Sequence, residues 1–147
     1  MSTKTRPELS EKNRFWIPKE RYYELKHFCL QYNDWCAKIA ELDGMARHSP
    51  GIDIPRNGGK VADPTGWAAE ARAKYCCLCT MVKEAAWAAV NEGDLVCQQR
   101  YHNALMTAVS EGLSYEQIVA LGLYDCSRSE WYKTYRKFFW CLNMIRD

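Results

Sequence analysis

The chain has 147 residues, of which 48% are hydrophobic and 26% are charged, with a formal net charge of +2. This balance fits a single domain, residues 1–147, that buries a hydrophobic core, and it excludes a disordered tail. A membrane helix needs about 18 consecutive apolar residues, and neither such a run nor an apolar signal segment is present. We therefore expect a cytoplasmic protein without membrane contact, whose eight cysteines are reduced thiols.

The first predicted element is one long helix from Pro18 to about Leu42, because Pro18 suits a first turn and Gly44 suits a stop. Its apolar residues alternate by three and four positions, as expected for a helix that packs on a partner helix. They are Tyr22, Leu25, Cys29, Tyr32, Cys36 and Ile39. Residues 43–63 hold four Gly and two Pro without a sustained period, which predicts a long loop.

A second long helix is predicted from Asp63-Pro64, a cap and first-turn pair, to about Asn91, with Gly93 as its stop. Its apolar stripe has the same spacing and consists of Ala68, Ala71, Tyr75, Leu78, Val82, Ala85 and Ala89. Together these helices predict a long antiparallel hairpin over residues 18–92, through which the chain forms a homo-oligomer.

The remaining residues, 94–147, predict three further helices. Asp94 caps a helix that Gly112 closes, and Ser114 caps a short helix from Tyr115 to about Ala120. A Gly-containing turn follows at 121–126, and Ser127 then opens a final helix with a capping box at Glu130. This order predicts a helix-turn-helix region at the end of an all-α helical bundle.

In a helix-turn-helix, the start of the second helix faces the bases while its other side packs on the domain. The final helix fits this pattern. Its apolar stripe comprises Trp131, Tyr135, Phe138 and Leu142, with Phe139 beside it. The predicted DNA-binding residues are Ser127, Arg128, Ser129, Lys133, Arg136 and Lys137. Thr134 belongs to the same outward set.

Charge alone leaves two interpretations of this helix open. Residues 1–26 carry seven Lys or Arg against four Glu, and residues 127–147 carry five against two acidic residues, around an acidic centre. Basic ends are typical of a surface that binds phosphates, but also of ordinary solvated helix faces. A basic amphipathic helix that only closes a bundle is therefore the alternative to a DNA-binding helix.

Metal, cofactor and catalytic chemistry are not expected. Cys76, Cys77 and Cys79 point in different directions around one helix, at about 100° per residue, so they cannot converge on one zinc ion. His48 and His102 lack a matching nucleophile or acid pattern. No glycine-rich phosphate loop is present.

Three segments, Asn13–Tyr32, Asp63–Tyr75 and Glu111–Leu142, resemble uncharacterised prophage proteins of Firmicutes. The last segment is similar to the helix-turn-helix end of phage late-gene transcriptional regulators of the autolysin-regulator and RinA type. The resemblance implies an oligomeric duplex-DNA-binding regulator in the host cytoplasm, with residue-level correspondence at Ser127–Lys137. Two other function classes stay open: a non-enzymatic inhibitor that binds a host protein, and a small DNA-packaging adaptor.

Overall fold

The computed structural model describes residues 13–48, 64–91 and 93–146. In this part of the chain the regular elements are all α-helices, so the predicted all-α class is confirmed. They are α1 (Lys19–Leu30), α2 (Tyr32–His48), α3 (Pro64–Ala89), α4 (Leu95–Glu111), α5 (Tyr115–Ala120) and α6 (Arg128–Arg146).

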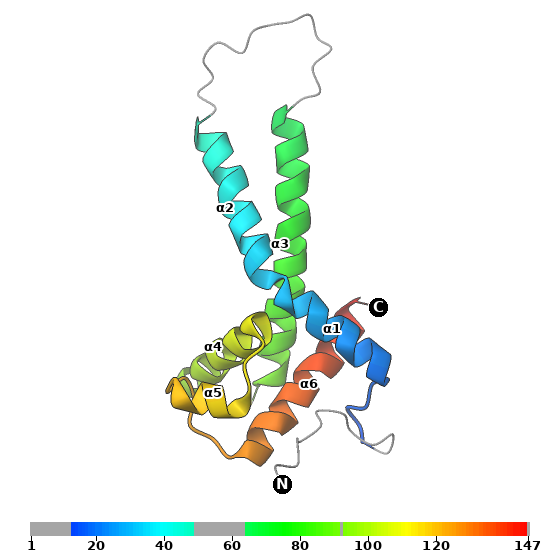
Figure 1. Cartoon of the computed structure of the whole chain (residues 1–147), viewed down its shortest axis with the longest axis vertical. Coiled ribbons are helices and arrows are strands. Elements are labelled where there is room, and N and C mark those ends of the chain that lie inside the picture. Colours follow the sequence, from blue (N-terminus) through cyan, green and yellow to red (C-terminus); the bar gives the residue numbers. More distant parts are fainter. Residues whose placement is uncertain (1–12, 49–63, 92, 147) are drawn as a thin grey trace, which may run out of the picture.

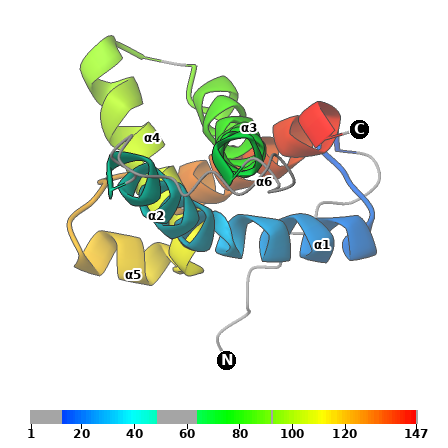
Figure 2. The same cartoon turned by 90° about the horizontal axis from the view of Figure 1, so that it is seen from above.

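The helix α3 is the centre of the bundle. It packs along α2 at one end and along α6 and α4 at the other, and Figure 2, which looks along α3, shows these three helices placed around it. Figure 1 shows α2 and the first part of α3 extending side by side away from the remaining helices. Within the described residues, each helix is too short or too polar to cross a membrane.

The core lies where α1, α4, α5 and α6 meet the second half of α3. Its largest fully buried side chains include Trp131, Phe138, Phe139, Leu25, Leu105 and Ile118, each of which stabilises the fold by about 1.5–3 kcal/mol through burial. From α3 the core receives small side chains, and Ala85 and Ala86 are fully buried. Small residues let neighbouring helices approach closely, which explains why the Ala-rich helix occupies the centre.

The prediction of one continuous helix from Pro18 to Leu42 is wrong, because the structure divides this segment at Gln31 into α1 and α2. The N–H of Gln31 donates to the carbonyl of Phe28 at 3.2 Å, a tight i to i−3 turn, and Figure 1 shows the chain changing direction there. The cause is tertiary: α1 packs on α4 and α6, whereas α2 packs chiefly on α3. The stripe shifts accordingly, since Cys36 is exposed and Trp35 is buried instead.

The predicted stop at Gly44 is also wrong, because α2 continues through Gly44 to His48. A glycine inside a helix costs only about 1 kcal/mol relative to alanine, and local contacts oppose that cost. Leu42 is buried, and Asp43 pairs with Arg72 of α3 at 2.5 Å. The rest of the predicted loop, residues 49–63, lies outside the described residues.

The boundaries of the last four helices agree with prediction. Asp94 accepts a hydrogen bond from the N–H of Cys97 at 2.8 Å and so caps α4, which holds the pKa of the Asp94 carboxyl below its usual value. Gly112 ends α4 with φ +70°, a left-handed conformation that glycine adopts without strain. Ser114 and Gln117 form a reciprocal capping box at the start of α5.

Candidate nucleic-acid interface

The short helix α5 is held against α6 and the core by specific contacts. Ile118 of α5 is buried in the core, and the hydroxyl of Tyr115 donates to the carbonyl of Cys126 at 2.6 Å. Gly122, with φ +67°, turns the chain after α5. The connection from Leu121 to Ser127 is longer than the three- to four-residue turn of the simplest helix-turn-helix.

The inward face of α6 consists of the predicted apolar stripe. Trp131, Tyr135, Phe138, Phe139 and Leu142 are all buried. The ring of Trp131 stacks on Tyr101 of α4 at 5.8 Å between centroids, and the hydroxyl of Tyr101 donates to the carbonyl of Glu130 at 3.1 Å. These contacts hold the start of α6 in one orientation relative to the bundle.

The predicted DNA-binding residues lie along the other side of α6. They differ in their exposure to solvent and in the hydrogen bonds that their side chains make. The side chain of Ser127 caps the helix, accepting from the N–H of Glu130 at 3.2 Å. Ser129 and Lys133 are exposed to solvent. Lys137 is half-buried, and its ammonium donates to the side-chain oxygen of Asn91 at 3.1 Å; half-buried Arg136 also makes contacts with neighbouring groups.

Arg128, the candidate for contact with a base edge, is engaged within the protein. Its guanidinium hydrogen-bonds to the carboxylate of Glu116 on α5 and lies 5.6 Å from the ring centroid of Tyr132. Both partners of the ion pair are about half exposed, at 45% and 57% of their side-chain areas. An exposed pair of this kind is worth about 0–1 kcal/mol, so the structure links α5 to α6 through a contact that is easily exchanged.

A groove of about 560 Å³ runs along one side of α6, and most of the residues that line it were not predicted as site residues. Lys133, Thr134 and Lys137 line one wall, and the N-terminal residues Arg14 and Phe15 line another. Phe15 reaches this place by packing edge-on against Trp140 of α6, with centroids 5.5 Å apart. Three cations therefore share one groove, which we call the α6 groove.

The lining of the α6 groove is also aromatic. Tyr101 and Tyr124 lie there with ring centroids 4.1 Å apart. Burial raises the pKa of both phenols above the ordinary value, so they stay neutral at physiological pH. The groove can thus attract phosphates through its cations and present flat rings to an apolar or stacking group, with the carboxylate of Glu130 at its edge.

The adjacent cysteines of α3 differ in surroundings, as their spacing predicted. Cys76 is half-buried, Cys77 is exposed and Cys79 is buried, so the three side chains point to different environments. Among the described residues, no group of three or more His, Cys, Asp or Glu side chains is arranged to hold a metal ion. Comparison with known proteins adds no relative: no protein-family model, no curated protein and no solved structure matches the chain.

Proposed function

We propose that the protein binds duplex DNA through α5 and α6 and acts as a transcriptional regulator of the phage type. The observation that carries this proposal is the division of α6 into two faces. The apolar stripe is buried, while Ser129 and Lys133 in the first turns are exposed. A helix that enters the major groove needs this combination of a fixed inner face and accessible polar side chains near its N-terminus.

The cations of the α6 groove are assigned to phosphates. Arg14, Lys133 and Lys137 line the same groove, and phosphate contacts made by Lys and Arg supply most of the salt-dependent affinity for DNA. Arg14 comes from the other end of the chain, so the N-terminal segment adds a second element to the interface. Phosphate contacts position the protein without reading sequence.

Sequence preference is assigned to Ser129 and Arg128. To contact a base, the guanidinium of Arg128 has to leave the carboxylate of Glu116. Loss of this exposed ion pair costs only about 0–1 kcal/mol, so a contact with a base can replace it. A bidentate contact of arginine with guanine contributes about 1–3 kcal/mol of discrimination. In the absence of DNA, Glu116 keeps the guanidinium at the start of α6.

Self-association through α2 and α3 completes the proposal. On the first part of α3, Trp67 is 62% exposed, while Tyr75 and Leu78 are only half-buried. A second copy of the hairpin would cover this surface. A dimer would also bring two α6 helices to two half-sites of a palindromic operator.

The test is selection of duplexes from a random library, followed by fluorescence anisotropy with the selected site. We expect binding at low salt, and we expect Lys133→Glu to weaken it strongly, because the substitution places a negative charge beside the DNA backbone. Lys83→Glu, an equal charge change at an exposed site on the second half of α3, is the control and should leave binding unchanged. Failure of the wild-type protein to bind any duplex at micromolar concentration rejects the function.

A protein-binding inhibitor is the second candidate, and one surface favours it. Leu95 and Val96, at the start of α4, are 80% and 70% exposed, and exposed apolar side chains that lie together are typical of a protein interface. Affinity capture from host lysate with and without nuclease separates the two functions. A partner that survives nuclease and is lost with Leu95→Asp supports the inhibitor, whereas nuclease-sensitive capture supports DNA binding.

A further inference from the structure

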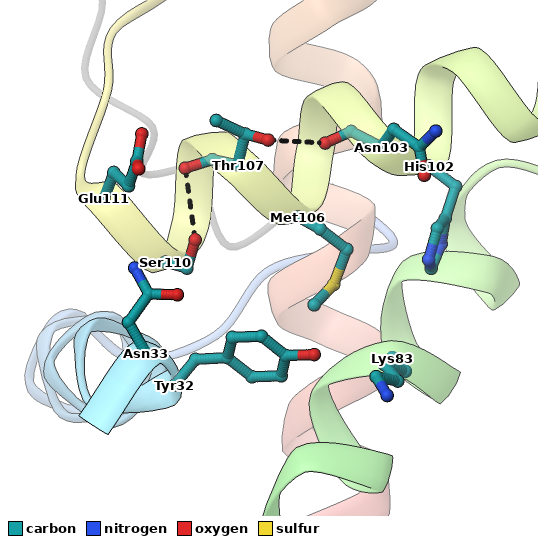
Figure 3. A pocket seen from close by; sticks show the side chains of 9 residues that line it. All are labelled: Tyr32, Asn33, Lys83, His102, Asn103, Met106, Thr107, Ser110 and Glu111. Atoms are coloured by element: carbon teal, nitrogen blue, oxygen red, sulfur yellow. Dashed lines mark hydrogen bonds between the residues drawn. The ribbon is translucent and has the colours of Figure 1, made fainter. Parts of the chain in front are cut away.

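The antiparallel helices α2 and α3 pack in a register that two separate observations define. Asp43 of α2 pairs with Arg72 of α3 at 2.5 Å. Nearer the bundle, Tyr32 of α2 and Lys83 of α3 line one groove, and Figure 3 shows the phenol of Tyr32 directed toward Lys83. Eleven residues separate the two positions on α2, and eleven separate the two on α3. Both observations therefore describe the same antiparallel register.

Between these two points, the register places Cys36 of α2 opposite Cys79 of α3. Cys36 follows Tyr32 by four residues, and Cys79 precedes Lys83 by four. Residues four apart share a helix face, so both thiols lie on the faces that meet. The thiols of Cys36 and Cys79 are within hydrogen-bonding reach of each other, and Cys36 also hydrogen-bonds with Tyr32. The two cysteines therefore span the interface between α2 and α3.

The two thiols differ in their access to solvent. Cys36 is exposed, so a small oxidant dissolved in water can reach its sulfur. Cys79 is only 4% exposed. Burial, followed by the neighbouring Cys36, raises the pKa of the Cys79 thiol to about 11, while the ammonium of Lys83 acts in the opposite direction. Cys79 is therefore protonated and shielded at neutral pH, and Cys36 is the thiol that meets an oxidant first.

The other cysteines of α3 are less well placed to meet Cys36. Cys76 shares a face with Cys79, but in this register it lies opposite Ile39. Cys77 is exposed, and at about 100° per residue it points away from the face of Cys79. Cys77 is therefore a matched control, because it is a solvent-accessible thiol on the same helix outside the interface.

We propose that Cys36 and Cys79 form a redox-sensitive pair that a hydroperoxide converts into a disulfide between α2 and α3. The sulfur of Cys36 attacks one peroxide oxygen and the O–O bond breaks. Cys36 becomes a sulfenic acid, and the other oxygen leaves with the thiol proton as water or, from an organic hydroperoxide, as an alcohol. This modification does not depend on the proposed DNA interface.

The second step consumes the buried thiol. The sulfur of Cys79 attacks the sulfenic sulfur of Cys36, the S–S bond forms and the S–O bond breaks, and the hydroxyl leaves as water with the proton of the Cys79 thiol. The ammonium of Lys83 stabilises the negative charge that develops on Cys79. In total the two thiols lose two electrons, and the hydroperoxide gains them. A dithiol reductant restores both thiols by exchange.

The disulfide would tie α2 to α3 across the segment between residues 36 and 79. A cross-link that closes a long segment stabilises a fold mainly by restricting the unfolded chain. We therefore expect oxidation to raise the melting temperature by at least about 4 °C and reduction to reverse the rise. Disulfides of this reversible kind are the ones that occur in reducing compartments, where they sense oxidants.

The test treats the reduced full-length protein with hydrogen peroxide, blocks the remaining thiols with N-ethylmaleimide and maps disulfides by mass spectrometry of an unreduced digest. We expect a Cys36–Cys79 linkage within one chain as the main product, and Cys77→Ser should leave its yield unchanged. Cys36→Ser should abolish both the linkage and the rise in melting temperature. In Cys79→Ala, dimedone should trap a sulfenic acid at Cys36, because the thiol that resolves it is gone.

The linkage map of the wild-type protein decides the matter even where a variant loses its fold by circular dichroism. The peroxide dose is raised until exposed Cys77 is oxidised, which provides an internal reference. Absence of the Cys36–Cys79 linkage at that dose refutes the proposal. Linkage of Cys36 to Cys76 instead, or disulfides only between two chains on a non-reducing gel, refutes it as well.

Discussion

Removal of the positive charge at Lys133 tests whether the α6 groove meets DNA, and its effect can be calculated from the structure. Arg14, Lys133 and Lys137 line the groove, so one protomer has three phosphate-directed cations there. Each neutralised phosphate contributes about −0.9 to the slope of log K against log salt, which gives a slope of about −2.7 for three contacts. Lys133→Ala should reduce it to about −1.8.

These slopes predict a measurable difference over a modest salt range. Between about 50 and 200 mM KCl, the wild-type affinity should fall about 40-fold and that of Lys133→Ala about 12-fold per protomer. Fluorescence anisotropy with one labelled duplex gives both values, and Lys83→Ala, at an exposed site on the second half of α3, should retain the wild-type slope. Identical slopes for Lys133→Ala and the wild type would refute the assignment of the α6 groove to phosphates.

Four further predictions concern the fold, the assembly and pH. Phe138→Ala should lower the free energy of unfolding by about 3–5 kcal/mol because Phe138 is fully buried, whereas exposed Met144→Ala should change it by less than about 0.5 kcal/mol in urea titrations. Gly112→Ala should cost about 1–2 kcal/mol in the same assay, because alanine is strained at φ +70°. Light scattering should show at least a dimer, and Leu78→Glu on the hairpin should yield a monomer. Because burial lowers the pKa of His102, the unfolded chain binds a proton that the folded one lacks; stability should therefore decline as pH falls below about 6.5, and His102→Phe should flatten this decline.

The helix ends that could be predicted are those set by local chemistry. Asp94 and Ser114 are followed by backbone N–H groups that their side chains can reach, and both make the expected hydrogen bonds. Gly112 adopts the left-handed conformation expected at the end of a helix. Each of these features depends on a few consecutive residues, so no knowledge of the packing was needed.

The break between α1 and α2 could not be predicted in this way. Gln31 is neither glycine nor proline, and the apolar spacing of three and four continues across it. Phe28 and Trp35, on the two sides of the break, pack edge to face at 4.7 Å. The two helices take different directions because they pack on different partners: α1 packs on α4 and α6, whereas α2 packs on α3. The apolar stripe of one helix does not show which helices it will pack on.

The candidate DNA-binding face was predictable in part. The buried and exposed sides of α6 follow from helical periodicity alone, and Trp131 and Lys133 lie where that periodicity places them. The ion pair of Arg128 with Glu116 and the position of Arg14 depend on how α5 and the N-terminal segment pack. The sequence signal for Arg14 is the run Arg14-Phe15-Trp16, which combines a basic residue with aromatic residues. Such a run indicates that the segment packs on the protein, but it does not indicate on which helix.

The surroundings of His102 illustrate a stronger limit on sequence reasoning, because they arise only through packing. Lys83 and His102 belong to different helices, and neither has a motif around it. What makes His102 unusual is the stacking on Trp87 and the sealed Nδ1 atom, both of which require α3 and α4 to be in contact. A histidine on a helix is ordinary in a sequence, and only the packed structure shows that this ring is buried against an indole.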